Sequence, residues 1–434
     1  MARASRIERY PPAESTYNRP FLQAFPRPRH NAHTTTAVNP NLDRLQTYPF
    51  QKLTALLTGV TPKEGLRPIS LHIGEPKHPT PQFIKDALTA NLDGLAAYPA
   101  TIGTLELRTA IARWLARRYE LPPVDPETQV IPVDGSREAL FAFAQAVIDS
   151  RKPDALVLCP NPFYQIYEGA ALLAQASPRY LNTLSENGYA CDYDAVSSAT
   201  WENTQLLYVC SPGNPTGHVM PLAEWKKLFD LSDRYGFVIA SDECYSEIYF
   251  DENDPPLGAM QAAHRLGRTG YPRLVVFSSL SKRSNVPGMR SGFVAGDAQI
   301  LKRFLLYRTY HGCAMSPPVQ AASVAAWQDE AHVVENRRLY REKFDAVYRI
   351  LKPVMNLDMP DAAFYFWAPT PGDDTDFTRR LYGEQGVSVL PGSYLARDSA
   401  GVNPGRGRVR IALVASTAEC TEAAHRIARF ISQH

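Results

Sequence analysis

The sequence predicts an α/β fold in which a large domain, with a mostly parallel β-sheet between helices, is joined to a smaller α+β domain. Three observations lead to this prediction. Between about residues 105 and 300, helical patterns alternate with short apolar runs, which is typical of a parallel sheet covered by helices on both faces. After about residue 320 the pattern changes to a long charged helix followed by a few short apolar runs. A chain of 434 residues is also long enough for a large and a small domain.

In chain order, residues 39–60 show a partly helical apolar rhythm around Pro49, and the large domain follows. Its helices are expected at 104–118, 136–149, 163–175 and 221–235, and its strands at ALVLC (155–159), QLLYVC (205–210), FVIAS (237–241), RLVVFS (273–278) and GFVAG (292–296). The smaller domain is expected to contain a helix around 318–351, the runs FYFWA (364–368) and RVRIALV (408–414), a helix near 374–385 and a last helix. The expected divisions are an N-terminal tail (1–37), an arm that joins the small domain (38–75), the large domain (76–325) and the small domain (326–434).

Residues 1–37 differ from the rest because they are rich in arginine and proline and poor in apolar residues. An arginine-rich, acid-poor start is one mark of an organellar transit peptide. Pro11, Pro12 and Pro20, however, would interrupt the amphipathic helix that such a peptide needs. We therefore expect a loosely ordered tail.

Composition narrows the classes of partner. Lys and Arg number 46 against 44 Asp and Glu, which leaves a formal net charge of +2, so no overall field attracts nucleic acid or a membrane surface. No apolar run reaches the roughly 18 residues that would span a bilayer. The six cysteines are scattered without a C-x-x-C pair, which predicts reduced thiols, a cytoplasmic protein and no metal site.

The segment SLSKRSNVPGMRSG, residues 279–292, follows a predicted strand and holds Ser279, Lys282 and Arg290. A lysine flanked by hydroxyls and a second cation suits an imine with an aldehyde whose phosphate must be neutralised. Nearby positive charge also lowers the pKa of such a lysine, as a nucleophilic amine requires. On its own, the segment is equally compatible with a solvated basic loop.

Other strand ends carry polar residues as well. Asp242 follows FVIAS, where an ionised carboxylate can keep a heterocyclic nitrogen protonated at the carboxyl edge of a sheet. Asn214 lies in the proline-flanked turn of YVCSPGNPTG, and its amide can donate to a ligand oxygen. Ser136 and Arg137 follow Gly135 at the start of a helix, whose free N–H groups suit a phosphate. Each is singly compatible with an ordinary turn or cap, but together they predict one crevice.

This set of motifs resembles the fold-type I, class I and II aminotransferases of the aspartate aminotransferase kind, which depend on pyridoxal 5′-phosphate (PLP). The resemblance runs from about residue 38 to 430 and rests on NPTG, on D-x-x-Y after a strand, on S-x-S-K followed by G-x-R-x-G, and on R-I-A-L near the end. It implies a sheet of the seven-stranded type, amino-acid and 2-oxo-acid substrates, and a homodimer.

For the cofactor, the resemblance implies that Lys282 holds PLP and moves the proton, and that Asp242 is the partner of the pyridinium nitrogen. Tyr245 and Asn214 match the pair that binds the phenolic oxygen. The other cofactor residues that it implies are Ser136, Arg137, Ser279 and Arg290 at the phosphate, Tyr164 stacked on the ring, and Tyr98 reaching the phosphate of the other subunit.

For the substrate, the resemblance implies that Arg410 grips the α-carboxylate, a bidentate task that suits arginine. It also places Gly74 and Asn214 along the substrate pocket, with Phe364 at its border. The stretch PDAAFYFW has Ala362 where the family usually has glycine, so the pocket for the substrate side chain is expected to differ.

Residues 39–60 and the stretch HIGEPKHPTP are similar to bacterial N-succinyldiaminopimelate aminotransferases. This similarity implies glutamate and 2-oxoglutarate as the second substrate pair and a role in lysine biosynthesis. An aminotransferase for aspartate, alanine or aromatic amino acids, or a PLP-dependent β-lyase, would use the same motif residues and stays open.

Two other classes are not indicated. A transcription regulator with an aminotransferase-like domain needs an N-terminal DNA-binding domain, for which residues 1–37 are too short and too interrupted by proline. A nicotinamide dehydrogenase is not expected because no G-x-G-x-x-G follows an early strand.

Overall fold

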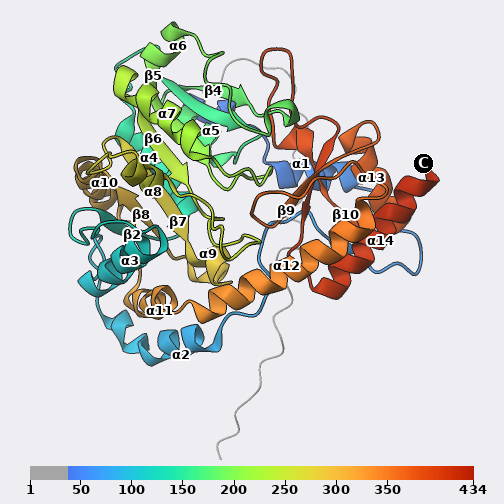
Figure 1. Ribbon diagram of the computed structural model, residues 1–434, viewed down its shortest axis with the longest axis horizontal. Helices are drawn as coiled ribbons and strands as arrows, with labels where there is room; N and C mark the ends of the chain where they lie inside the picture. Colours follow the sequence, from blue (N-terminus) through green and yellow to red (C-terminus); the bar gives the residue numbers. More distant parts are fainter. Residues whose placement is uncertain (1–37) are drawn as a thin grey trace, which may run out of the picture. The chain divides into compact units, whose positions relative to one another are not determined.

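The computed structural model describes residues 38–434, of which residues 41–434 form one compact unit. The predicted N-terminal tail, residues 1–37, lies outside the described residues. The unit is built around a seven-stranded sheet with the strand order β2-β8-β7-β6-β5-β3-β4 (Figure 1).

The strands of this sheet are β2 (Val130–Val133), β3 (Leu156–Asn161), β4 (Ser177–Asn182), β5 (Thr204–Cys210), β6 (Val238–Asp242), β7 (Leu274–Ser279) and β8 (Gly292–Gly296). Neighbouring strands from β4 to β7 pair in parallel, whereas β8 is antiparallel to both β7 and β2. The prediction of a mostly parallel, seven-stranded sheet is confirmed. The parallel strands end at one edge of the sheet, and β8 begins there.

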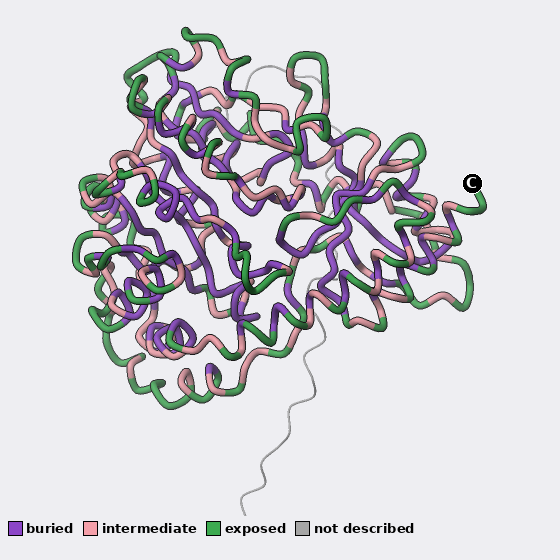
Figure 2. The backbone as a smooth tube through the Cα atoms, in the orientation of Figure 1, coloured by how far each residue is buried: buried purple, intermediate pink, exposed green. Residues whose placement is uncertain are grey.

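Helices cover both faces because successive side chains of a strand point to opposite sides. On β5, Leu207 and Val209 enter one apolar core, and Leu206 and Tyr208 enter another on the opposite face. The first core is closed by α3 (Leu105–Arg118), α7 (Leu222–Tyr235), α8 (Ala259–Arg265) and α11 (Pro317–Gln328), and the second by α4 (Ser136–Val147), α5 (Ile166–Leu173) and α10 (Ala298–His311). Figure 2 shows the buried backbone running along the strands between the more exposed helices.

A second group of elements has its own apolar core. The strands β9 (Tyr365–Pro369), β11 (Leu390–Pro391) and β12 (Arg408–Ala412) form an antiparallel sheet in the order β11-β12-β9. A two-stranded parallel sheet pairs β1 (Ile69–Ser70) with β10 (Val387–Ser388). The helices of this group are α1 (Pro49–Leu57), α12 (Ala331–Leu351), α13 (Asp374–Gln385) and α14 (Thr417–Gln433). The predicted domain boundaries stay a prediction, because residues 41–434 form one unit.

The remaining helices are α2 (Gln82–Ala90), α6 (Ser198–Asn203) and the single turn α9 (Leu280–Arg283). Side-chain caps explain where several helices begin. The carboxylate of Asp297 accepts backbone N–H groups at the start of α10, and Asp373 does the same for α13. Ser416 and Glu419 form a capping box at α14, so the free N–H groups of these helix starts are satisfied within the chain.

The helix predicted around 318–351 is two helices, because α11 ends at Gln328 and α12 begins at Ala331. Between them Asp329 adopts an extended conformation, with φ −99° and ψ 132°. Its carboxylate accepts a hydrogen bond from the N–H of His332, as a helix cap does. The prediction of one continuous helix was therefore wrong, because the chain leaves the helical conformation at Asp329 before α12 begins.

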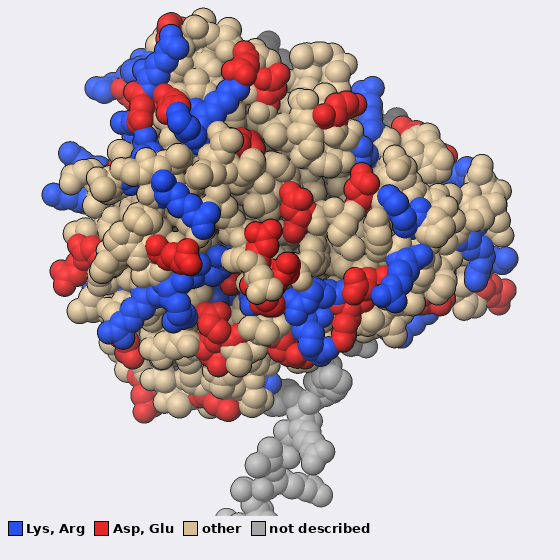
Figure 3. All heavy atoms as spheres, viewed as in Figure 1, with Lys and Arg blue, Asp and Glu red and all other residues tan. Residues whose placement is uncertain are grey.

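No helix among residues 38–434 is long and apolar enough to cross a membrane. On the face drawn in Figure 3, basic and acidic side chains are interspersed rather than gathered by sign. This distribution agrees with the formal net charge of +2.

Candidate active site

The predicted site residues gather at the edge of the large sheet where its parallel strands end. Asp242 is the last residue of β6 and Ser279 the last of β7, while Asn214 lies in the turn after β5. Because β8 is antiparallel, it begins at the edge where its neighbours end. The short connection from β7 to β8 therefore carries both Lys282 and Arg290 along this edge.

Lys282 lies on the single turn α9, with its side chain directed at the backbone of Gly74. Its Nζ donates to the carbonyl oxygen of Gly74 at 2.6 Å and lies 5.4 Å from the ring centroid of Phe364. Burial, assisted by the charges of Arg410 and Arg137, lowers the pKa of Lys282 to about 8. A lysine amine with this pKa is partly unprotonated near neutral pH and can act as a nucleophile.

Asp242 is a buried carboxylate at the end of β6, at the same edge of the sheet. Its Oδ2 accepts a hydrogen bond from the hydroxyl of Tyr167 at 2.7 Å, and its Oδ1 accepts the N–H of Cys244 at 3.3 Å. Burial raises the pKa of Asp242, against these two hydrogen bonds and the charge of Lys282, which favour the ionised form. Positive charge brought to this carboxylate would offset the cost of its burial.

Arg410 reaches the same region from β12 of the smaller sheet. Its Nη1 donates to Oδ1 of Asn214 at 2.9 Å and its Nη2 to the carbonyl oxygen of His72 at 3.0 Å. The guanidinium carbon lies 4.4 Å from the ring centroid of Tyr365. Its Nε is buried and has no hydrogen-bond partner among residues 38–434. A carboxylate bound here would satisfy that donor.

Tyr245 and Tyr365 line one wall of the site beside Gly74. Their hydroxyl oxygens lie 2.8 Å apart, and the Tyr245 ring meets the ring of Phe364 edge-on at 5.3 Å. A Cβ on Gly74 would lie 2.0 Å from the hydroxyl oxygen of Tyr365, so position 74 requires glycine. The structure brings Tyr245, Gly74 and Phe364 together, while their roles toward a cofactor and a substrate stay predictions.

The predicted phosphate cradle lies at the start of α4. Gly135 has φ +87° and directly precedes Ser136, and a helix start presents N–H groups without intrahelical partners. A Cβ on Gly135 would lie 2.1 Å from Nη2 of Arg290, so only glycine lets the arginine approach so closely. The helix start and Arg290 together concentrate positive charge in a form that suits an anion.

The hydroxyl of Ser279 is used within the chain. Its Oγ accepts the N–H of Ser281 at 3.0 Å and so caps α9, and it lies 2.8 Å from Oγ of Ser281. Contact of Ser279 with a phosphate therefore stays a prediction.

Three further predicted residues take different positions. Tyr164 accepts a hydrogen bond from Nε of Arg137 at 2.5 Å, which places Arg137 beside the ring expected to stack on the cofactor. Ala362 is buried and its N–H donates to the carbonyl oxygen of Gly217 at 3.1 Å. Tyr98 is fully exposed, and its contact with a second subunit stays a prediction.

The described residues fit PLP group by group. Lys282 can hold the aldehyde carbon, the start of α4 with Arg290 can hold the phosphate, and Asp242 can pair with the ring nitrogen. Asn214 accepts from Arg410 through its oxygen, which leaves its NH₂ group to donate to the phenolic oxygen.

Two side chains of this site, Tyr167 and Tyr365, were not predicted from the sequence. Tyr167 holds Asp242 and stacks on Tyr208 with ring centroids 4.6 Å apart. Tyr365 touches Arg410 and Tyr245. Tyr167 lies three residues after the predicted Tyr164, and Tyr365 directly follows the predicted Phe364 in the run FYFWA, so a second aromatic residue close in sequence was the available signal.

Comparisons with known proteins identify the family. A family model described as aminotransferase class I and II matches residues 67–427. An LL-diaminopimelate aminotransferase from Nitratidesulfovibrio vulgaris (strain DSM 19637 / Miyazaki F) is 33% identical over 396 residues, which cover 89% of this chain and 98% of that protein. An LL-diaminopimelate aminotransferase from Aquifex aeolicus is 31% identical over 376 residues, which cover 84% of this chain and 92% of that protein.

Solved structures agree with this family. An aminotransferase from Neisseria meningitidis Z2491 has a TM-score of 0.88 and 54% identity, with 91% of this chain and 100% of that chain covered. The aminotransferase AspB from Helicobacter pylori 26695 has a TM-score of 0.83 and 34% identity, with coverage of 90% and 100%.

Proposed function

Because the chain belongs to the class I and II aminotransferases, which are PLP-dependent transaminases, we propose that it transfers the amino group of a diaminopimelate to 2-oxoglutarate. The products are glutamate and the corresponding oxo acid. The observation that carries this substrate proposal is the match, over most of the chain, to relatives named LL-diaminopimelate aminotransferases. In the reverse direction, in which glutamate donates the amino group to the oxo acid, the reaction would serve lysine and diaminopimelate biosynthesis.

Two forms of the substrate are candidates. Free LL-diaminopimelate comes first, because the relatives from N. vulgaris and A. aeolicus carry its name. The N-succinyl derivative comes second, because residues 39–60 and HIGEPKHPTP are similar to N-succinyldiaminopimelate aminotransferases. The two differ in charge and size at the distal end, where one presents a free amino group and the other a succinyl amide.

The chemistry would be divided between the cofactor and the chain. When bound, PLP supplies a conjugated pyridinium ring that takes up the electron pair of the substrate Cα–H bond. Nζ of Lys282, favoured as a free amine by a pKa of about 8, accepts the proton from the substrate Cα. Asp242 keeps a proton on the ring nitrogen, and the hydroxyl of Tyr167 keeps Asp242 in place.

Arg410 would orient the substrate for this proton transfer. Its Nη1 on Asn214 and its Nη2 on the carbonyl oxygen of His72 fix the plane of the guanidinium, and its Nε has no partner among residues 38–434. A carboxylate bound against that plane holds the Cα–H bond in one direction relative to Lys282. Asn214 accepts a hydrogen bond from Arg410, and with its NH₂ group on the phenolic oxygen of the cofactor it would couple the two binding sites.

A substrate panel tests the proposal. Purified protein is supplied with PLP, 2-oxoglutarate and one amino donor at a time, chosen from LL-diaminopimelate, N-succinyl-LL-diaminopimelate, aspartate, alanine and phenylalanine, and glutamate formation is measured. We expect kcat/KM for one diaminopimelate to exceed that for aspartate by at least about tenfold, since polar sites discriminate against ligands that leave them unpaired. If the enzyme uses aspartate as a donor but neither form of diaminopimelate, the substrate proposal is refuted, although the aminotransferase class stands.

A single-turnover measurement separates transamination from β-elimination. Glutamate alone is mixed with the PLP-loaded protein, and the 2-oxoglutarate released is quantified. We expect about one equivalent per site, because a transaminase keeps the amino group after the first half of the reaction. Catalytic release of ammonia from β-substituted amino acids, without 2-oxoglutarate formation, would favour a β-lyase.

A further inference from the structure

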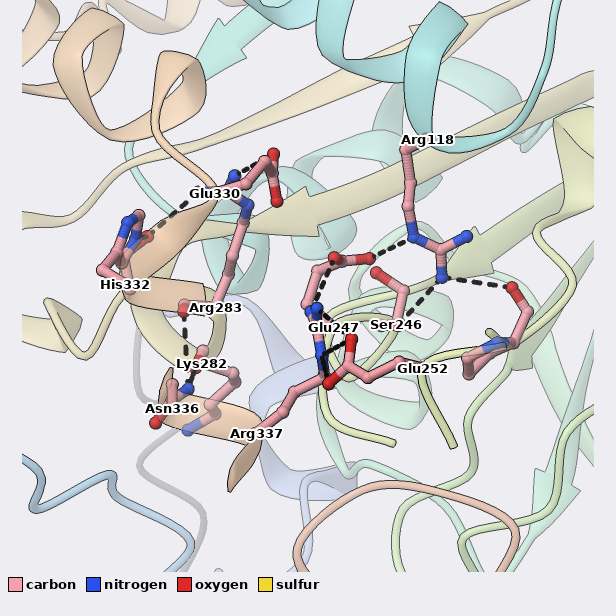
Figure 4. Close-up of polar contacts among 12 residues, drawn as sticks. Arg118, Ser246, Glu247, Glu252, Lys282, Arg283, Glu330, His332, Asn336 and Arg337 are labelled. Atoms are coloured by element: carbon pink, nitrogen blue, oxygen red, sulfur yellow. Dashed lines mark hydrogen bonds and ion pairs between the residues drawn. The ribbon is translucent and has the colours of Figure 1, made fainter. Parts of the chain in front are cut away.

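The connection that carries Lys282 lies against the first turns of α12 (Figure 4). Oε1 of Glu330 accepts a hydrogen bond from Nη2 of Arg283 at 2.7 Å. Nε2 of His332 lies 2.8 Å from Oγ of Ser284. These contacts fix the side chains of the residues that follow Lys282, but they do not touch Lys282 itself.

Asn336, on the next turn of α12, is the residue that contacts the backbone of Lys282. Its Nδ2 donates to the carbonyl oxygen of Lys282 at 3.2 Å and lies 3.4 Å from that of Arg283 (Figure 4). Because α9 is a single turn, its last carbonyls have no partner further along the helix. Asn336 thus supplies the capping donors from a distant part of the sequence.

Chemistry fixes which way the Asn336 amide points. The group that faces two carbonyl oxygens must be the NH₂, because a carbonyl oxygen only accepts. Its Oδ1 then accepts from Nδ2 of Asn285 at 3.0 Å and from Nδ1 of His78 at 2.7 Å. The side chain is 2% exposed, and both ends of its amide are engaged.

The same logic sets the proton on His78. Since Oδ1 of Asn336 accepts, Nδ1 of His78 carries the hydrogen, and Nε2 is left to accept from Nζ of Lys343 at 2.5 Å. Burial and the charge of Lys343 lower the pKa of His78, which favours this neutral form. The result is a chain of donors running from Lys343 through His78 and Asn336 to the carbonyl of Lys282.

This chain of donors returns to the segment that receives the Lys282 side chain. Nζ of Lys282 donates to the carbonyl of Gly74, and His78 lies a few residues further along the same irregular segment. The backbone carbonyl of Lys282 is thus fixed to His78 through Asn336, and its amine is fixed to Gly74. The backbone and the side-chain amine of Lys282 are thus both held in place relative to residues 74–78.

We propose that Asn336 is a positioning residue for Lys282, holding the α9 backbone so that Nζ stays at a fixed place relative to residues 74–78, with His78 orienting Asn336. The role concerns proton transfer by Lys282 and does not depend on which amino acid is the substrate. Helix α12 also carries Tyr340, whose ring centroid lies 5.5 Å from that of Phe364. The same helix therefore supports the residue expected to border the substrate pocket.

The test compares three PLP-loaded proteins: the wild type, Asn336→Asp and Asn336→Ala. Asn336→Asp keeps the size but sets an acceptor against two carbonyls. We expect both variants to lower kcat by about tenfold to a hundredfold, as misplacement of a reacting group by about 1 Å does. KM for the amino donor should stay within about twofold, because Arg410 is untouched.

A spectroscopic readout separates positioning from general stability. The visible absorbance of Lys282-bound PLP is titrated with pH, and its midpoint should shift by about half a unit or more in both Asn336 variants, because the environment of Nζ changes. Arg338→Ala is the matched control, since Arg338 lies on the same helix and pairs only with exposed acids among residues 38–434. This control should leave the midpoint and kcat unchanged.

His78 gives an independent variant if the Asn336 variants fold poorly. His78 lines a cavity of about 470 Å³, which has room for added imidazole. His78→Ala should lower kcat and shift the midpoint in the same direction as Asn336→Ala, and imidazole should partly restore both. The proposal is overturned if the folded variants melt earlier yet keep the wild-type midpoint and a kcat within twofold, or if Arg338→Ala shifts the midpoint equally.

Discussion

At the scale of single residues, burial sets the protonation states on which the site depends. Burial raises the pKa of Asp242 and lowers that of Lys282 to about 8, so both groups move toward their neutral forms. A buried carboxylate gains most from a positively charged partner, whereas an amine with a lowered pKa gains nucleophilicity. The raised pKa of Asp242 thus favours binding of a cationic partner, and the lowered pKa of Lys282 favours nucleophilic attack, within the same crevice.

Asp242→Asn keeps the shape of the side chain and its contact with Tyr167 but removes the charge. We expect kcat to fall on the order of a hundredfold or more, because an electrostatic partner of the reacting group is lost. Steady-state turnover and PLP affinity are measured together. Asp230→Asn, on the exposed side of α7, is the control, and near-normal turnover in Asp242→Asn would rule out the role.

The lowered pKa of Lys282 predicts how the rate of PLP binding to the PLP-free protein depends on pH. Only the unprotonated amine reacts with the aldehyde, so the rate of PLP uptake should rise with pH to about 8 and then level off. At pH 7 the rate should exceed that expected for an amine at the ordinary lysine pKa of 10.5 on the order of a hundredfold. Recombination rates from pH 6 to pH 10 check this, and a midpoint near the ordinary lysine value of 10.5 would contradict it.

At the scale of elements, strand ends were predictable from the sequence and helix breaks were not. The apolar runs 237–241 and 273–278 end within a residue of β6 and β7, so the placement of Asp242 at the sheet edge followed from local pattern. The break at Asp329 did not, because aspartate is also found within helices and its capping contact with His332 exists only in the fold.

The contact of Tyr167 with Asp242 and that of Asn336 with Lys282 could not be predicted from the sequence for the same reason. Tyr167 contacts a residue 75 positions away and Asn336 one 54 positions away. No local periodicity distinguishes them from a core tyrosine or a helical asparagine. Lys282, by contrast, lies within a dense motif whose chemistry can be read residue by residue.

An ion pair joins the turn after β5 to the segment before β9. Burial by itself would lower the pKa of His218, but hydrogen bonds with Asp361 and Glu224 raise it to about 9. Because this value lies above the ordinary 6.5, the stabilisation is fully present below pH 6.5 and is lost as the pH rises through about 9.

Asp361→Asn should therefore lower the free energy of unfolding at pH 6 by about 1 kcal/mol or less, since Asp361 is largely exposed. At pH 10 the variant and the wild type should be equally stable. Denaturant melts at the two pH values measure the difference. Asp358→Asn, an exposed neighbour in sequence, is the control, and an equal loss at both pH values would show that the histidine charge is not involved.

At the scale of the whole molecule, the exposed Tyr98 bears on the predicted homodimer. Its ring is fully exposed in the described chain, and a second subunit is the expected source of its partner. Mixed charges on the surface in Figure 3 offer no single-sign field that would oppose self-association.

Mixing Tyr98→Phe subunits with Lys282→Ala subunits tests shared sites. If Tyr98 serves the neighbouring subunit, each hybrid dimer has one site with both residues intact and one with neither. Activity after mixing equal amounts and re-equilibration should then exceed the average of the two separate variants, because about half of the dimers are hybrids with one intact site each. A monomer by light scattering that is fully active would refute the homodimer.

The antiparallel pairing of β7 with β8 is closed by only the short connection that carries Lys282 and Arg290. Closing a short loop costs less chain entropy than bringing together distant segments, and local pairings of this kind favour fast folding. We expect this hairpin to form before β2 docks on its far side. Lys282 and Arg290 would then be set relative to each other while the remaining strands are still assembling. Because a ligand that binds the native sheet edge stabilises that arrangement, we expect PLP present during refolding to raise the yield of native protein.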